Sequence, residues 1–197
     1  MKLFMYKLLF KQFAIVAFII LAILSIVFGA VLPWMKARLY INALTDMQSG
    51  KTYTSEQFES QMGNIFDFYS PIGQEEIVKF FGSDILSVVS QADFPESASR
   101  FLADYIEKYL FKNNVRHLIL GGASYKYLWY RFGNEEDFKK SEEYFKKAQL
   151  IGPKLPPVLY DLFELYRLRG DDENMKKIGE EILKYWPDDA GIKQAIS

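Results

Sequence analysis

The chain of 197 residues has no cysteine and a single histidine, His117. Disulfide bonds, thiolate metal sites, cysteine nucleophiles and multi-histidine metal centres are therefore excluded. Lysine and arginine number 24 against 25 acidic residues, so the net charge is −1 and nothing global favours nucleic acid as a partner. We expect no cofactor, no metal ion, no nucleic acid partner and no enzymatic activity.

Strand signals are missing as well. The sequence contains no sustained alternation of apolar and polar residues and no Asn-Gly or Asp-Gly pair between apolar runs. Half of its residues are nevertheless apolar, which is enough to build a sizeable core. The sequence therefore predicts an all-α fold.

The longest apolar run, FAIVAFIILAILSIVFGAVL, occupies residues 13–32 and contains no charge. As a helix it would be about 30 Å long, which matches the hydrocarbon core of a bilayer. We predict a single transmembrane helix over 13–33, with Trp34 as an interfacial anchor. Two alternatives stay open, namely a cleaved signal peptide cut at Gly29 or Ala30 and a buried core helix.

The flanks of this run indicate an orientation. Three lysines precede it, while Lys36 and Arg38 follow closely, so the positive-inside bias favours a cytoplasmic tail over residues 1–12. The rest of the chain would then lie outside the cytoplasm. Pro33 is expected to end or kink the membrane helix, and a helical juxtamembrane stalk is predicted over 34–53, broken by QSGKTY at its end.

A helical segment is predicted over residues 54–113. Its first helix opens with a capping box formed by Thr54 and Gln57. A second amphipathic helix is expected over 75–90, and a third begins at Pro95.

The remainder, 114–197, is repetitive, since Pro153 and Pro187 lie 34 residues apart. Two helix pairs are predicted, followed by a short helix, over 115–132, 135–151, 156–169, 172–186 and 190–197. This pattern resembles the tetratricopeptide repeat, in which glycine closes the first helix and proline follows the second. The residues that carry the resemblance are Phe138, Tyr144, Phe145, Ala148, Pro153, Leu162, Tyr166, Gly170, Asp171 and Pro187. The resemblance implies an α-solenoid-like domain with about two repeats.

The second pair departs from the family pattern at four positions. Phe163 stands where the family has a small residue, Met175 and Ile182 stand where it has alanine, and Gly179 lies inside the second helix. These departures bear on how tightly the helices stack, and the helix-pair architecture is expected to hold.

The layout as a whole also resembles the carboxy-terminal region of O-antigen ligase-like membrane proteins. The stretches that carry this resemblance are KARLYINAL, FYSPIGQEEI and KKSEEYFKKAQLIGP. It implies an extracytoplasmic repeat domain beside glycan-assembly machinery. The ligase's membrane core of many helices is absent from the sequence, so its catalytic activity is not carried over.

The tetratricopeptide resemblance also implies a binding surface, because the first helices of such pairs line a concave wall. The candidate protein-binding residues are Lys126, Tyr127, Tyr130, Arg131, Asp161, Arg167 and Arg169. We therefore interpret the chain as a membrane-anchored scaffold for protein–protein interaction in the cell envelope or in glycan assembly. Two alternatives stay open, an accessory part or fragment of a glycan ligase system and an ancillary subunit of a translocation complex, and so does the oligomeric state.

Three further features have simpler interpretations than chemistry. His117 is expected to be a surface or partly packed residue. Asp161 and Glu164, three residues apart, are expected to solvate their helix, because no second carboxylate pair completes a metal site or a glycosidase dyad. GGAS, at 121–124, lacks the lysine and spacing of a phosphate loop, and its small residues favour close helix packing.

Overall fold

The computed structural model describes residues 2–49 and 54–197, and within these ranges every regular element is helical. The all-α prediction is confirmed. The chain forms two compact units, residues 1–77 and residues 78–197, which are described separately below. The boundary between the units falls inside the segment 54–113, which was predicted as one helical segment.

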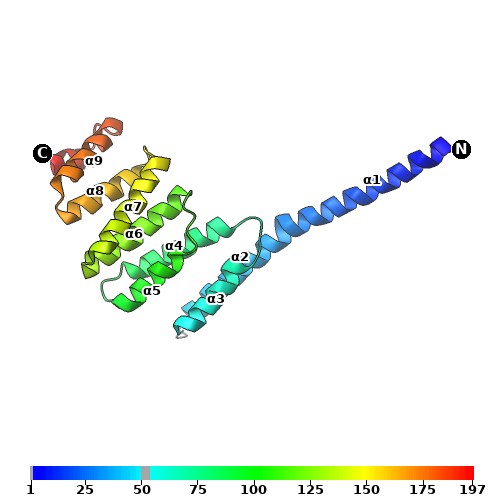
Figure 1. Ribbon diagram of the computed structural model, residues 1–197, viewed down its shortest axis with the longest axis horizontal. Coiled ribbons are helices and arrows are strands. Elements are labelled where there is room, and N and C mark those ends of the chain that lie inside the picture. The colour runs from blue at the N-terminus through cyan, green and yellow to red at the C-terminus, as the bar shows by residue number, and fades with distance from the viewer. Residues whose placement is uncertain (1, 50–53) are drawn as a thin grey trace. The chain divides into compact units, whose positions relative to one another are not determined.

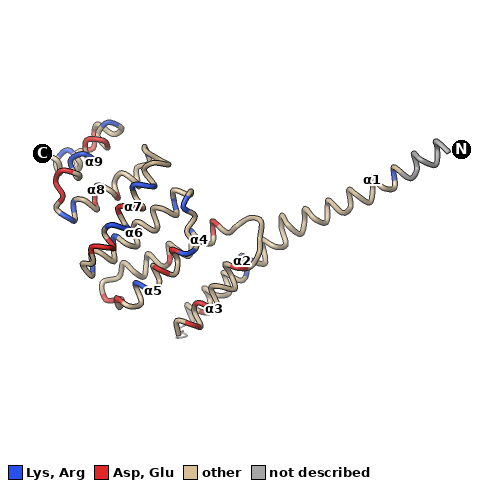
Figure 2. Tube along the Cα trace, viewed as in Figure 1, with Lys and Arg blue, Asp and Glu red and all other residues tan. Residues whose placement is uncertain are grey.

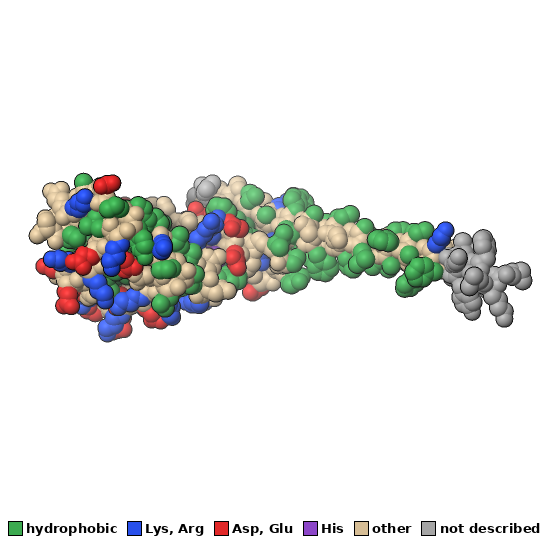
Figure 3. Space-filling view, turned by 90° about the horizontal axis from the view of Figure 1, so that it is seen from above, with side chains coloured by type: hydrophobic (Ala, Val, Ile, Leu, Met, Phe, Trp, Pro, Cys, Tyr) green, Lys and Arg blue, Asp and Glu red, His purple; other side chains and the backbone are tan. Residues whose placement is uncertain are grey.

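The first unit begins with one long helical rod. It consists of α1 (Lys2–Ile26), a π-helical turn η1 (Val27–Val31) and α2 (Leu32–Gln48). From Phe10 to Met47 this rod is long and apolar enough to span a membrane, and its most apolar stretch is not buried within the protein. Figure 3 shows hydrophobic side chains along it, and Figure 2 shows a long stretch of α1 without charged residues.

Pro33 does not end the helix, contrary to one of the two outcomes expected for it. A proline cannot donate a backbone hydrogen bond, and its ring crowds the preceding turn. In the structure the preceding turn is η1, where the Leu32 N–H bonds to the Val27 carbonyl across five residues. This wider turn accommodates the ring, so α2 continues to Gln48 as the predicted helical stalk. Part of the predicted break after it, residues 50–53, lies outside the described residues.

The third helix of the first unit, α3 (Ser55–Asp67), has the predicted capping box. The Gln57 N–H bonds to the Thr54 hydroxyl oxygen at 3.3 Å, and the Thr54 N–H bonds to the Gln57 side chain at 3.1 Å. α3 packs antiparallel against α2 (Figure 1). The buried side chains of this unit include Tyr40, Ala43, Met62, Ile65 and Phe66.

The second unit starts within α4 (Gln74–Val89) and continues with α5 (Glu96–Glu107). The rings of Phe81 on α4 and Tyr105 on α5 meet edge to face, with centroids 6.5 Å apart. Both helices agree with the sequence prediction.

Two helix pairs follow, α6 (Val115–Phe132) with α7 (Glu135–Ile151) and α8 (Pro156–Arg169) with α9 (Asp172–Tyr185). Their bounds agree with the prediction to within one residue. The partners of each pair are packed together, α7 also packs on α8, and the short helix α10 (Ala190–Ile196) packs on α9. Gly133 and Gly170 close the first helix of each pair with φ of 73° and 72°, a conformation that glycine adopts without a steric penalty.

α6 and α7 approach each other closely at two glycines of the GGAS stretch. A Cβ on Gly121 would lie 2.9 Å from the Tyr144 ring, and one on Gly122 would lie 2.6 Å from the Phe145 ring. The Ser141 hydroxyl donates to the Gly122 carbonyl at 2.8 Å in the same buried contact. The expectation that these small residues permit close packing is confirmed.

Candidate functional site

The first candidate site is a hollow of about 340 Å³ between α6 and α8, which we call the α6–α8 hollow. Helical spacing builds it, because side chains three or four residues apart lie on the same face of α6 and on the same face of α8. Four of the seven predicted residues line it, together with two that were not predicted. The lining residues are Lys126, Tyr127, Tyr130, Glu164, Arg167 and Leu168.

An ion pair joins the two helices on either side of the α6–α8 hollow. Lys126 Nζ donates to Asp161 Oδ1 at 2.6 Å, and the two side chains are 11% and 25% exposed. The Lys126 ammonium also lies 5.7 Å from the centre of the Phe145 ring. Lys126 therefore connects α6 with α7 and α8, and Asp161 is its counter-ion.

The rim of the α6–α8 hollow is more accessible. Arg167 donates two hydrogen bonds to Glu164, at 2.7 and 2.8 Å, in the fork geometry typical of arginine and carboxylate. This hydrogen-bonded pairing lowers the pKa of Glu164 and raises that of Arg167. Tyr130 is 63% exposed and stands beside them as a large aromatic surface. Asp161 and Glu164 do not form a carboxylate pair, because Asp161 pairs with Lys126 and Glu164 pairs with Arg167.

Arg131 does not line the hollow. Its guanidinium donates to the carbonyls of Val89 at 2.6 Å, of Ala92 at 3.1 Å and of Phe94. These hydrogen bonds hold the connection between α4 and α5 against α6. Its place in the sequence, next to Tyr130, carries no sign of this role.

Arg169 also lies away from the lining. Its guanidinium pairs with Glu135 at 2.7 Å and lies 3.9 Å from the centre of the Phe138 ring. This contact ties the end of α8 to the start of α7.

His117 is more deeply packed than expected. Its side chain is 1% exposed, and its Nδ1 accepts a hydrogen bond from the Phe111 N–H at 3.1 Å. The histidine thus stabilises the turn before α6.

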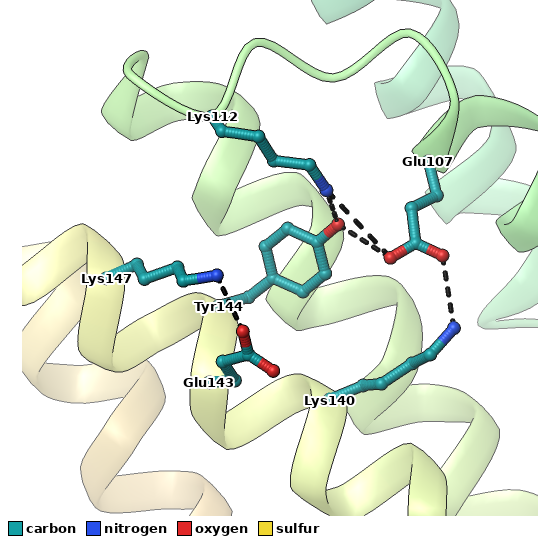
Figure 4. Close-up of a pocket in the computed structure, with 6 residues that line it drawn as sticks. All are labelled: Glu107, Lys112, Lys140, Glu143, Tyr144 and Lys147. Carbon is teal, nitrogen blue, oxygen red and sulfur yellow. Dashed lines mark hydrogen bonds and ion pairs between the residues drawn. The ribbon is translucent and has the colours of Figure 1, made fainter.

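The second candidate site is a polar cluster around Glu107, at the junction of α5, α6 and α7 (Figure 4). Tyr144 donates to Glu107 Oε1 at 2.8 Å, and Tyr125 donates to Oε2 at 2.5 Å. Lys140 reaches the same Oε2 at 3.1 Å, and Lys112 donates to the Tyr144 hydroxyl. Four donors, from α6, from α7 and from the turn before α6, therefore converge on one carboxylate and one phenol.

The electrostatics of the cluster hold Glu107 in its charged form. Burial opposes ionisation, but hydrogen bonds from Tyr125, Tyr144 and Lys140 outweigh it and lower the pKa of Glu107. Burial and the neighbouring carboxylate raise the pKa of both tyrosines, so they act as neutral donors. Burial lowers the pKa of Lys112.

A pocket of about 110 Å³ opens beside this cluster and is lined also by Glu143 and Lys147. Glu143 and Lys147 pair at 2.6 Å, so the charges around the pocket are largely compensated. The cluster is best understood as a junction between helices. Glu107 is not among the residues predicted from the sequence, although two buried tyrosines on facing helices are a signal that an acceptor is needed.

Comparison with protein-family models, curated proteins and solved structures found no match for this chain. The class of this protein therefore rests on its structure alone. It is an all-helical protein with an apolar amino-terminal helix and a domain of consecutive helix pairs.

Proposed function

We propose that this protein is a membrane-anchored scaffold that holds a segment of another protein in the α6–α8 hollow, with no catalytic role of its own. The hollow is the observation that carries the proposal. Tyr127, Tyr130 and Leu168 give it an apolar and aromatic wall, and Arg167 gives it a rim donor. Tyrosine and arginine are the residue types that most often anchor protein interfaces.

The anchoring part of the proposal rests on the rod from Phe10 to Met47. Its most apolar stretch has no protein cover, and a bilayer would bury it. The excess of lysine before the rod's apolar run favours an orientation with the helix pairs outside the cytoplasm. The tetratricopeptide resemblance supports protein binding, and the resemblance to ligase-associated repeat domains supports a place in envelope or glycan assembly.

The hollow also indicates the chemistry of its ligand. Lys126 and Arg167 are matched by Asp161 and Glu164, so the site has no net charge to attract a highly acidic chain. A peptide carboxylate or carbonyl oxygen could replace Glu164 at Arg167, because that pair lies at the exposed rim. We therefore expect a segment with an apolar side chain for the tyrosine wall and one acceptor for Arg167.

Photocrosslinking in cells tests this proposal. The photoreactive residue p-benzoylphenylalanine replaces Tyr130 in the full chain, and a matched variant carries it at Lys176, which is exposed on α9. We expect one defined protein adduct from position 130 that is absent from position 176 and that weakens when Arg167→Gln is added. Equal adducts from both positions, or none from position 130, would remove the hollow as the binding site.

A further inference from the structure

The turn between α3 and α4, residues 68–73 with the sequence FYSPIG, lies beside the apolar part of the rod. The rings of Tyr69 and Phe28 meet edge to face, with centroids 6.5 Å apart. Phe28 belongs to the apolar run 13–32, four residues before its end. At about 1.5 Å per residue, Tyr69 therefore stands roughly 6 Å inside the end of that run.

The position of this 68–73 turn is fixed by Lys36. Its Nζ donates to the Phe68 carbonyl at 2.6 Å and lies 3.4 Å from the Phe66 carbonyl, at the carboxy-terminal end of α3. These carbonyls are where a helix end is electronegative, so the ammonium fits there. Lys36 is 2% exposed, which means that the first charge after the apolar run faces protein.

The surface of the 68–73 turn is unusual for a loop. Tyr69 is 66% exposed, Ile72 is 58% exposed, and Pro71 is exposed between them. The turn contains no charged residue, and the Ser70 hydroxyl donates to the Ile72 carbonyl at 2.7 Å, so this hydroxyl is satisfied within the turn. Tyrosine with one apolar body and one polar tip is the residue type enriched where hydrocarbon meets water.

We propose that the 68–73 turn enters the membrane interface beside the rod and forms a second contact of this protein with lipid. The inference rests on the proposed membrane anchor, since the same bilayer that covers residues 13–32 would cover the level of Phe28 and Tyr69. Exposed Ile72 and Pro71 then contact lipid at the headgroup boundary, with Trp34 on the rod as a further interfacial residue. The contact fixes the α2–α3 hairpin against the membrane.

The absence of cysteine in the chain allows a direct test by spin labelling. A nitroxide is attached to a single cysteine in three variants of the full chain, Ile72→Cys, Ile20→Cys and Ser55→Cys. Position 20 lies in the middle of the apolar run, and position 55 lies at the other end of α3. Each protein is reconstituted at low density into phosphatidylcholine vesicles, and collision of the label with oxygen and with a water-soluble nickel chelate is measured.

We expect the ratio of oxygen to nickel accessibility at position 72 to be several-fold higher than at position 55 and to approach that at position 20. A nickel-accessible label at 72 beside an oxygen-accessible label at 20 would overturn the inference and leave the anchor in place. A label at 72 that neither reagent reaches would indicate cover by a second copy of the chain and would also overturn it. A nickel-accessible label at 20 would overturn the anchor itself.

A second measurement uses the unlabelled chain. Ile72→Asp places a charge on an exposed position, so folding is preserved while entry into the interface becomes unfavourable. We expect protease access at the 68–73 turn in intact vesicles to rise several-fold in this variant, whereas Ser55→Asp should leave it unchanged. Equal access in Ile72→Asp and in the original chain would contradict lipid contact at Ile72.

Discussion

Lys126 on α6, which lines the α6–α8 hollow, and Asp161 on α8 form an ion pair of 2.6 Å that joins the two helix pairs. Both residues are among those expected to contact a ligand, and each supplies the counter-ion of the other. The pair lies mostly out of solvent, where losing one partner leaves the other charge uncompensated. Its role is therefore to set the spacing of the helices that carry Tyr130 and Arg167.

Lys126→Met should lower the free energy of unfolding by about 1.5–3 kcal/mol, because it removes a hydrogen bond between charged groups and leaves Asp161 unpaired. Adding Asp161→Leu should restore much of the loss, since two apolar side chains need no counter-ion. Urea unfolding of the full chain in detergent, followed by tryptophan fluorescence, measures both. Lys139→Met, at an exposed pair with Glu136, is the control and should change nothing measurable.

Two glycines in helices should respond to alanine in opposite directions. Gly122→Ala places a methyl group against the Phe145 ring and should destabilise the protein by about 1–3 kcal/mol through overpacking. Gly63→Ala, on α3, meets no atom within 4 Å and should stabilise by about 0.4–1 kcal/mol through the lower entropy of the unfolded chain. The same unfolding assay compares them, and losses of equal size would contradict the close contact of α6 and α7.

The helix bounds could be predicted from the sequence because local chemistry determines them. Asn134 caps α7 through the Glu136 N–H at 3.0 Å, and Gly133 ends α6 in a left-handed conformation. Such signals depend on a few adjacent residues. The partners of Arg131 and Glu107 lie up to 42 residues away in sequence, so they follow from packing, which no local pattern reports.

The packing of the second helix pair also could not be predicted from single positions of the sequence. Phe163 stands where the repeat pattern has a small residue, which bears on how tightly the helices can stack. In the structure Gly179 lies opposite, and a Cβ there would come within 3.2 Å of the Phe163 ring. The glycine leaves room for the large Phe163 ring, so α8 and α9 pack closely even though each position alone departs from the pattern.

Glu107 should make the free energy of unfolding decrease at acid pH. Its folded pKa lies below the ordinary value of 4.5, so its contribution is complete above that pH and is lost as the pH falls through the folded pKa. Glu107→Gln should therefore be clearly less stable than the original chain at pH 7, and the gap should narrow below pH 4.5. Urea midpoints across this range measure the gap. Glu180→Gln removes an exposed carboxylate from α9 and controls for net charge, and a gap independent of pH would contradict the assignment.

Arg131 and Arg167 were both predicted to contact a ligand, but replacing them should affect different properties. The Arg131 variant should lose stability, and the Arg167 variant should lose ligand binding. Arg131→Gln removes donors from the three carbonyls between α4 and α5 and should lower the free energy of unfolding by about 1–3 kcal/mol. Arg167→Gln removes an exposed pair and should leave unfolding unchanged, while it reduces the adduct formed from position 130. The unfolding assay and the photocrosslinking assay together separate the two roles. If Arg167→Gln unfolded the chain, or left the adduct intact, Arg167 would not be a ligand contact.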